Sequence, residues 1–112
     1  MNLNFLSELL KLDAVSGREE AVRSAIIAEI TPYATTEIDA SGNLIAFKKG
    51  KKTPKYRLMI DAHTDEVGLI ITSITDKGYL KFKNVCGIDN TTLLFKKVKI
   101  NGKINGVIGG KP

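Results

Sequence analysis

The chain has 112 residues, with 17 lysines and arginines, 12 aspartates and glutamates, one histidine and one cysteine. This length fits one domain, or one domain and part of another, and an apolar content of 43% excludes a disordered chain. A compact chain of this size buries roughly 65% of the surface that its unfolded form exposes. The single cysteine, Cys86, excludes an intramolecular disulfide and a multi-cysteine zinc site, and we expect it to be a small buried residue.

Nothing in the sequence predicts a membrane segment. The longest apolar run, Val67–Ile71, is far shorter than the roughly 20 residues that span a bilayer. The N-terminus has no basic start followed by an apolar stretch, so no signal peptide is predicted. With a single cysteine, these features favour a cytoplasmic location.

The charge is distributed unevenly along the chain. Residues 1–40 carry three basic and seven acidic side chains, whereas residues 41–112 carry fourteen basic and five acidic ones. The basic part admits one hypothesis, a free-standing β-rich module that binds nucleic acid or another polyanion. However, the lysine cluster at 48–55 contains no aromatic residue, although Tyr56 follows it, and it has only Arg57 as a nearby arginine, which is more typical of a solvated hairpin tip.

The first 32 residues predict two helices. Residues 3–12 repeat leucine at helical spacing, and residues 14–17 interrupt the pattern. Ser16 and Glu19 match a capping box, in which the serine oxygen accepts a backbone N–H and the glutamate reaches back to the cap. The second helix should run to about Ile30, with Val22, Ile26 and Ile30 on one face, and Pro32 should end it.

The remaining segments predict strands. Three hairpins are expected because turn residues separate short apolar runs, at 36–39 with 44–48, 67–74 with 79–85, and 98–100 with 104–108. Residues 56–62 have an apolar centre without strict alternation, which favours a strand buried on both faces inside a sheet. The order predicts an α/β layer followed by a small β unit.

Potential chemistry is concentrated in Asp61–Glu66, which holds the only histidine and three carboxylates directly after the expected buried strand. On a strand, Asp61, His63 and Asp65 would share a face, at the strand end where open α/β sheets place their sites. An imidazole with a carboxylate that fixes its tautomer is typical of a metal site. A lone histidine is also often an ordinary surface or core residue, and one histidine supplies too few ligands for a complete zinc site.

Five stretches together resemble the N-terminal part of the glutamyl and deblocking metallo-aminopeptidases, a family known for tetrahedral assemblies, some of whose members are labelled cellulase or endoglucanase. In order, they are residues 15–23, 39–44, 62–68, 87–89 and 106–112. Since the last stretch stops just after a strand, we expect the chain to be cut from a larger protein. No carboxylate pair can be assigned as a glycosidase acid and nucleophile, so the cellulase label has no support here.

The resemblance implies a fold and a domain division. Residues 1–66 would form the N-terminal part of a zinc-peptidase-like α/β/α catalytic domain. Residues 67–112 would begin an inserted, small β-barrel-like domain that serves subunit contact in a homo-oligomer. One departure lies at Phe95, where the family pattern has a glycine.

The resemblance also implies an activity. The parent protein would hydrolyse N-terminal residues from peptides with water activated by two divalent metal ions, zinc or cobalt. His63 would be a metal ligand, and Asp65 the catalytic carboxylate that holds the imidazole. The other ligands and the general base would lie beyond this chain, which by itself is expected to be inactive and metal-free, with no nucleic-acid or membrane partner.

Overall fold

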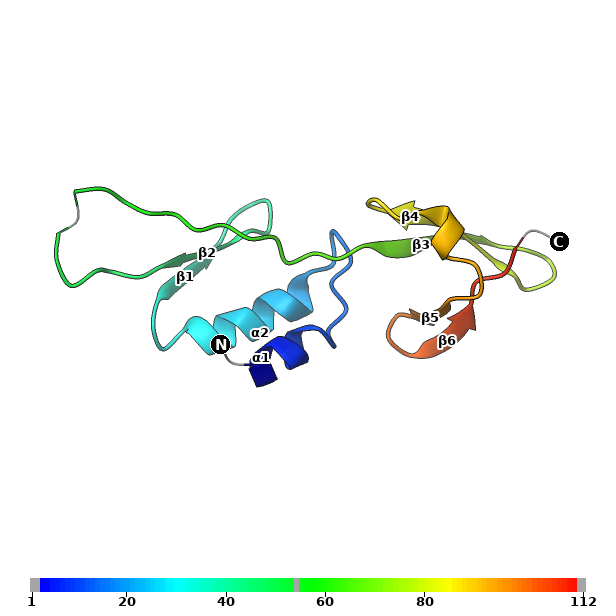
Figure 1. Cartoon of the computed structure of the whole chain (residues 1–112), viewed down its shortest axis with the longest axis horizontal. Coiled ribbons are helices and arrows are strands. Elements are labelled where there is room, and N and C mark those ends of the chain that lie inside the picture. Colours follow the sequence, from blue (N-terminus) through cyan, green and yellow to red (C-terminus); the bar gives the residue numbers. More distant parts are fainter. Residues whose placement is uncertain (1–2, 54, 111–112) are drawn as a thin grey trace. The chain divides into compact units, whose positions relative to one another are not determined.

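The computed structural model describes residues 3–53 and 55–110, which belong to two compact units. The helical unit contains the chain up to Leu12 and Glu19–Thr64, and the β unit contains Asp13–Arg18 and the chain from Asp65 onward. Figure 1 labels their elements in chain order. No helix within the described ranges is long and apolar enough to cross a membrane.

Two helices open the helical unit, as predicted. α1 covers Leu3–Leu9, and residues 10–12 form a turn rather than its last part. α2 covers Glu20–Ile30 and ends where predicted, with Val22 buried and Ile26 and Ile30 half-buried. The predicted apolar face of this helix is therefore confirmed.

The predicted capping box is wrong. α2 begins four residues after Ser16, and its N-cap residue Glu19 makes no side-chain capping hydrogen bond. Gly17 has a φ of +84°, which is a left-handed conformation that no first helical residue adopts. Ser16 therefore cannot be the cap of this helix, and its hydroxyl is used elsewhere.

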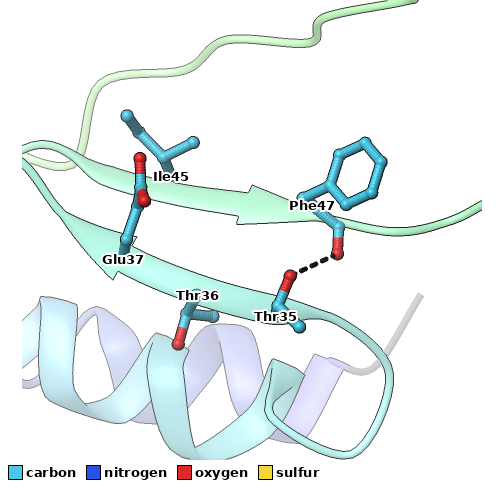
Figure 2. Close-up of a pocket in the computed structure, with 5 residues that line it drawn as sticks. All are labelled: Thr35, Thr36, Glu37, Ile45 and Phe47. Carbon is cyan, nitrogen blue, oxygen red and sulfur yellow. Dashed lines mark hydrogen bonds between the residues drawn. The ribbon is translucent and has the colours of Figure 1, made fainter.

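The first hairpin is confirmed. β1 (Thr35–Ile38) pairs antiparallel with β2 (Leu44–Phe47), and Glu37 lies opposite Ile45. Figure 2 shows the shallow pocket on this hairpin, where Thr36 points toward the helices and Glu37, Ile45 and Phe47 point to the opposite face. Ile45 and Phe47 are 46% and 59% exposed, so this face of the hairpin leaves apolar side chains open to solvent.

A network of hydrogen bonds closes the loop between β1 and β2. The Asp39 carboxylate accepts hydrogen bonds from the backbone N–H groups of Ser41 and Asn43, both at 2.9 Å, and from the Asn43 amide at 2.8 Å. These bonds, the Asn43 side chain first, lower the pKa of Asp39 because they favour its charged form. Arg23 on α2 donates to the carbonyl oxygen of Gly42 at 2.9 Å, which ties this loop to the helix.

The strand predicted at 56–62 is absent, and that prediction is wrong. Residues 57–65 belong to no helix or strand, and Leu58, Met59 and Ile60 are 87%, 85% and 87% exposed. The segment is apolar, but a strand needs a neighbour to accept and donate its backbone hydrogen bonds. The described part of the chain supplies no such neighbour.

Within the described residues, the β unit contains two hairpins and one 3₁₀ turn, and both predicted hairpins are confirmed. β3 (Gly68–Ile74) pairs with β4 (Leu80–Val85), with a register irregularity between Ile71 and Ser73. η1 (Asn90–Thr92) follows, capped by Asp89, whose pKa is lowered by the hydrogen bonds that Thr91 donates to it. β5 (Lys97–Ile100) then pairs with β6 (Ile104–Val107).

Little of the chain is buried. In the described ranges, the buried apolar residues are Ala14, Val22 and Ile108. The chain exposes 10167 Å², whereas a compact protein of 12.2 kDa exposes about 6,100 Å². Since the unfolded chain would expose about 17,700 Å², folding buries only about 40% of that surface rather than the expected 65%.

The exposed run Leu58–Ile60 predicts self-association. Apolar patches and unpaired backbone recruit partners, so sedimentation velocity should show concentration-dependent oligomers of the 112-residue chain. The double variant Leu58→Lys/Ile60→Lys should sediment more nearly as a monomer. The control Ile104→Lys, at a residue 63% exposed on β6, should associate like the wild type. A monodisperse wild-type monomer at all concentrations would contradict this prediction.

Phe95 is predicted to strain the β unit. Its φ is +64°, a left-handed conformation that costs a side-chain-bearing residue about 1–2 kcal/mol, and its N–H donates to the Ile108 carbonyl at 2.9 Å. Its ring is 76% exposed, so Phe95→Gly loses little burial and should raise the free energy of unfolding by about 1 kcal/mol. Urea unfolding measures this change.

Two controls separate backbone strain from loss of the ring. Phe95→Ala removes the ring but keeps the left-handed conformation, and should not stabilise the chain. Phe47→Gly, at a strand position of β2 that is 59% exposed, should destabilise it by roughly 0.5–1 kcal/mol. A lower unfolding free energy for Phe95→Gly would show that the ring matters more than the backbone.

Candidate functional site

The loop before α2 is attached by its backbone to the end of the Asp61–Glu66 segment. Val15 and Glu66 form an isolated parallel bridge. The Glu66 N–H donates to the Ala14 carbonyl at 2.8 Å, and the Ser16 N–H donates to the Glu66 carbonyl at 3.3 Å. The Glu66 carboxylate also accepts from the Ala14 N–H at 3.3 Å. Two segments about fifty residues apart in sequence are thereby held side by side.

Close packing accompanies this bridge. A Cβ atom added to Gly68, the first residue of β3, would overlap the Val15 side chain, with Val15 Cγ1 only 2.7 Å away. Glycine is therefore required at position 68, because the backbone itself packs against Val15. Ala14, in the same loop, is only 3% exposed.

The bridge brings Ser16 to Asp65. The Ser16 hydroxyl donates a hydrogen bond to Asp65 Oδ2, and Ser16 Oγ also lies 2.9 Å from Cys86 Sγ. Ser16 and Asp65 are both half-buried. Cys86 is exposed, so the expectation of a buried cysteine is wrong, and its backbone is left-handed with a φ of +65°.

The other candidate residues are placed differently. Asp61 and His63 are exposed and lie in the helical unit, whereas Asp65 begins the second part of the β unit. The shared face of Asp61, His63 and Asp65 was expected from a strand, and this segment forms none. An imidazole with a nearby carboxylate in sequence has the chemistry of one metal ligand and its partner.

The described residues do not complete a metal site. Nowhere in residues 3–53 and 55–110 do three or more His, Cys, Asp or Glu side chains gather closely enough to hold an ion. His63 and Asp65 therefore match one metal ligand and its hydrogen-bond partner, whereas a catalytic zinc ion usually has three protein ligands.

Sequence reasoning missed the role of Ser16. Its partner Asp65 is 49 residues away and its neighbour Cys86 is 70 residues away. The only local signal, the Ser-x-x-Glu spacing, indicated a helix cap. The parallel bridge that brings Ser16 to Asp65 has no signature in either segment alone.

Comparison with known proteins gives a consistent result. The sequence profile of the M42 glutamyl aminopeptidase family matches residues 42–112. A curated protein of Acetivibrio thermocellus, provisionally named an aminopeptidase, is 40% identical over 107 residues, which are 95% of this chain and 31% of that protein. The chain thus spans about a third of the length of the curated relatives it matches.

Solved structures agree with this match. An endoglucanase of Thermotoga maritima superposes with a TM-score of 0.84 at 37% identity, over 94% of this chain and 33% of that one. The TET1 peptidase of Pyrococcus horikoshii, described as assembling into a tetrahedron or a large octahedral shell, superposes with a TM-score of 0.78 at 39% identity, over 98% and 33% of the two chains. The mixed helix and strand fold is therefore shared with these proteins.

Gly68→Ala is predicted to weaken the bridge. The new methyl group would overlap the branched Val15 side chain, so we expect a loss of about 1–3 kcal/mol in the free energy of unfolding. Gly87→Ala is the matched control, since a Cβ there meets no atom within 4 Å. Val15→Ala combined with Gly68→Ala should recover part of the loss. Equal stability of Gly68→Ala and Gly87→Ala would contradict the packing argument.

Proposed function

Because the chain belongs to the M42 glutamyl aminopeptidase family, we propose that it forms the N-terminal third of an aminopeptidase that removes N-terminal residues from peptides. The observation that carries this proposal is the family match over residues 42–112. Relatives aligned along nearly the whole chain support it. The comparisons give no support to the alternative of a basic module that binds nucleic acid.

The proposed division of labour follows the family resemblance. Residues 1–66 belong to the catalytic α/β domain, and residues 67–112 begin an inserted β domain that contacts other subunits. The intact enzyme, in which this segment is followed by the rest of the family's fold, is a cytoplasmic homo-oligomer. The tetrahedral and octahedral assemblies described for the Pyrococcus horikoshii peptidase support the homo-oligomeric state.

The proposed site contains His63 as a metal ligand and Asp65 as the carboxylate that orients its imidazole. Two divalent metal ions held there, zinc or cobalt, would supply the Lewis acidity that polarises a scissile carbonyl and makes a water nucleophilic at neutral pH. A carboxylate that accepts the second imidazole N–H fixes the tautomer and makes the ring a better ligand. Asp65 is suited to this role because its own position is restrained by Ser16.

The isolated chain lacks the rest of such a site. Among the residues that the structure describes, no cluster of His, Cys, Asp and Glu could hold an ion. We propose, from the family resemblance, that the bridging carboxylate, the remaining ligands and the general base come from the rest of the enzyme. We infer that the 112-residue chain binds metal weakly at most and does not turn over peptides.

Variants of the intact enzyme test the proposed site. His63→Ala should abolish hydrolysis of aminoacyl-nitroanilides and reduce the metal content measured by mass spectrometry, because a ligand is lost. Asp65→Asn should keep the fold and lose about 10–100-fold in rate, as is typical when the partner of a metal ligand is removed. Asp76→Asn, in the turn between β3 and β4, is the matched control and should keep the wild-type rate.

The same assay applied to the 112-residue chain with added zinc or cobalt should show no turnover. Robust turnover by the purified chain would mean that the site is complete without further residues. Full activity and metal content in the His63→Ala enzyme would remove His63 from the site.

A further inference from the structure

Ser16 is fixed from two directions at the edge of the Asp65 carboxylate. Its backbone N–H donates to the Glu66 carbonyl at 3.3 Å, within the parallel bridge between Val15 and Glu66. Its hydroxyl donates to Asp65 Oδ2. The residue next to Asp65 thus holds the Ser16 backbone, while the Ser16 side chain holds Asp65 itself.

The contact with Cys86 has a defined direction. A serine hydroxyl carries one proton, and Ser16 gives this proton to Asp65. The 2.9 Å approach of Cys86 Sγ to Ser16 Oγ is therefore a hydrogen bond in which the thiol donates and the hydroxyl accepts. The three side chains form a directed series from Cys86 through Ser16 to Asp65, in which each bond polarises the next.

We propose that Ser16 is a positioning residue of the aminopeptidase, acting through Asp65; this inference rests on the proposed function. A carboxylate rotates readily about its terminal torsion, which is broad in energy. The hydrogen bond to Oδ2 restrains this rotation and so sets the direction in which Oδ1 points. A carboxylate with a fixed direction holds an imidazole in one tautomer and one orientation, which a freely rotating carboxylate does not.

The side-chain contribution is separable from the backbone bridge. Ser16→Ala removes the hydroxyl but leaves the backbone N–H and the Val15–Glu66 bridge, whereas Ser16→Thr retains a hydroxyl. Ser73→Ala, an exposed serine on β3 in the same unit, is the matched control. Protection of the Glu66 amide from hydrogen exchange, which depends on its bond to the Ala14 carbonyl, reports whether the bridge survives in each variant.

The intact enzyme provides the test. Ser16→Ala should lower kcat by about tenfold, near the lower limit for lost support of a metal ligand, with KM changed by less than about twofold. Zinc affinity, measured by competition with a chromophoric chelator, should fall by a similar factor. Ser16→Thr should restore most of both quantities, and Ser73→Ala should change neither. Cys86→Ala should have a smaller effect than Ser16→Ala, because a thiol is a weak donor.

The outcomes separate this inference from the proposed function. If His63→Ala abolishes activity while Ser16→Ala keeps wild-type kcat and zinc affinity, the role of Ser16 is overturned and the proposed function stands. The role is also overturned if Ser16→Thr is as impaired as Ser16→Ala with Glu66 still protected, or if Cys86→Ala costs more than Ser16→Ala. If His63→Ala is fully active, the proposed site and the role of Ser16 both fail.

Discussion

The parallel bridge between Val15 and Glu66 is the constraint on which the arrangement of the loop before α2 and of Ser16 and Asp65 depends. It joins the loop before α2 to the start of β3 through backbone hydrogen bonds in both directions. Because a backbone bridge sets the separation of the two segments that it joins, it also determines which of their side chains are in contact. Val15 packs against the bare backbone of Gly68, and Ser16 reaches Asp65 and Cys86. Only glycine at position 68 permits this approach.

The elements that the sequence predicted correctly are those whose partners are close in the chain. The three hairpins have their turns between their own strands, and the apolar face of α2 is a property of eleven successive residues. The strand at 56–62 was predicted wrongly because burial and pairing are not local. The run Leu58–Ile60 is as apolar as a buried strand, but the described chain has no neighbour to pair with it.

In the candidate site, too, the residues close together in sequence could be predicted, whereas the distant partner could not. His63 and Asp65 could be selected from their spacing and from the family resemblance, since both lie in one six-residue segment. Ser16 could not be linked to them, because its local spacing to Glu19 matched a helix cap and Asp65 is 49 residues away. The left-handed conformation of Gly17 prevents the helix from starting after Ser16. Ser16 is therefore a hydrogen-bond partner of Asp65 and not a helix cap.

The exposed run Leu58–Ile60 also bears on the synthesis of the protein. In an enzyme with the length of its relatives, more than two hundred residues remain to be translated once this run leaves the ribosome, which takes some tens of seconds at about 5–20 residues per second. Throughout that time the run is an aggregation hazard for the nascent chain. Arg57 and the lysines of residues 48–55 precede it in the sequence, and charged residues beside an apolar segment act as gatekeepers against aggregation. The basic residues therefore lie where charged side chains would shield this exposed apolar segment during synthesis.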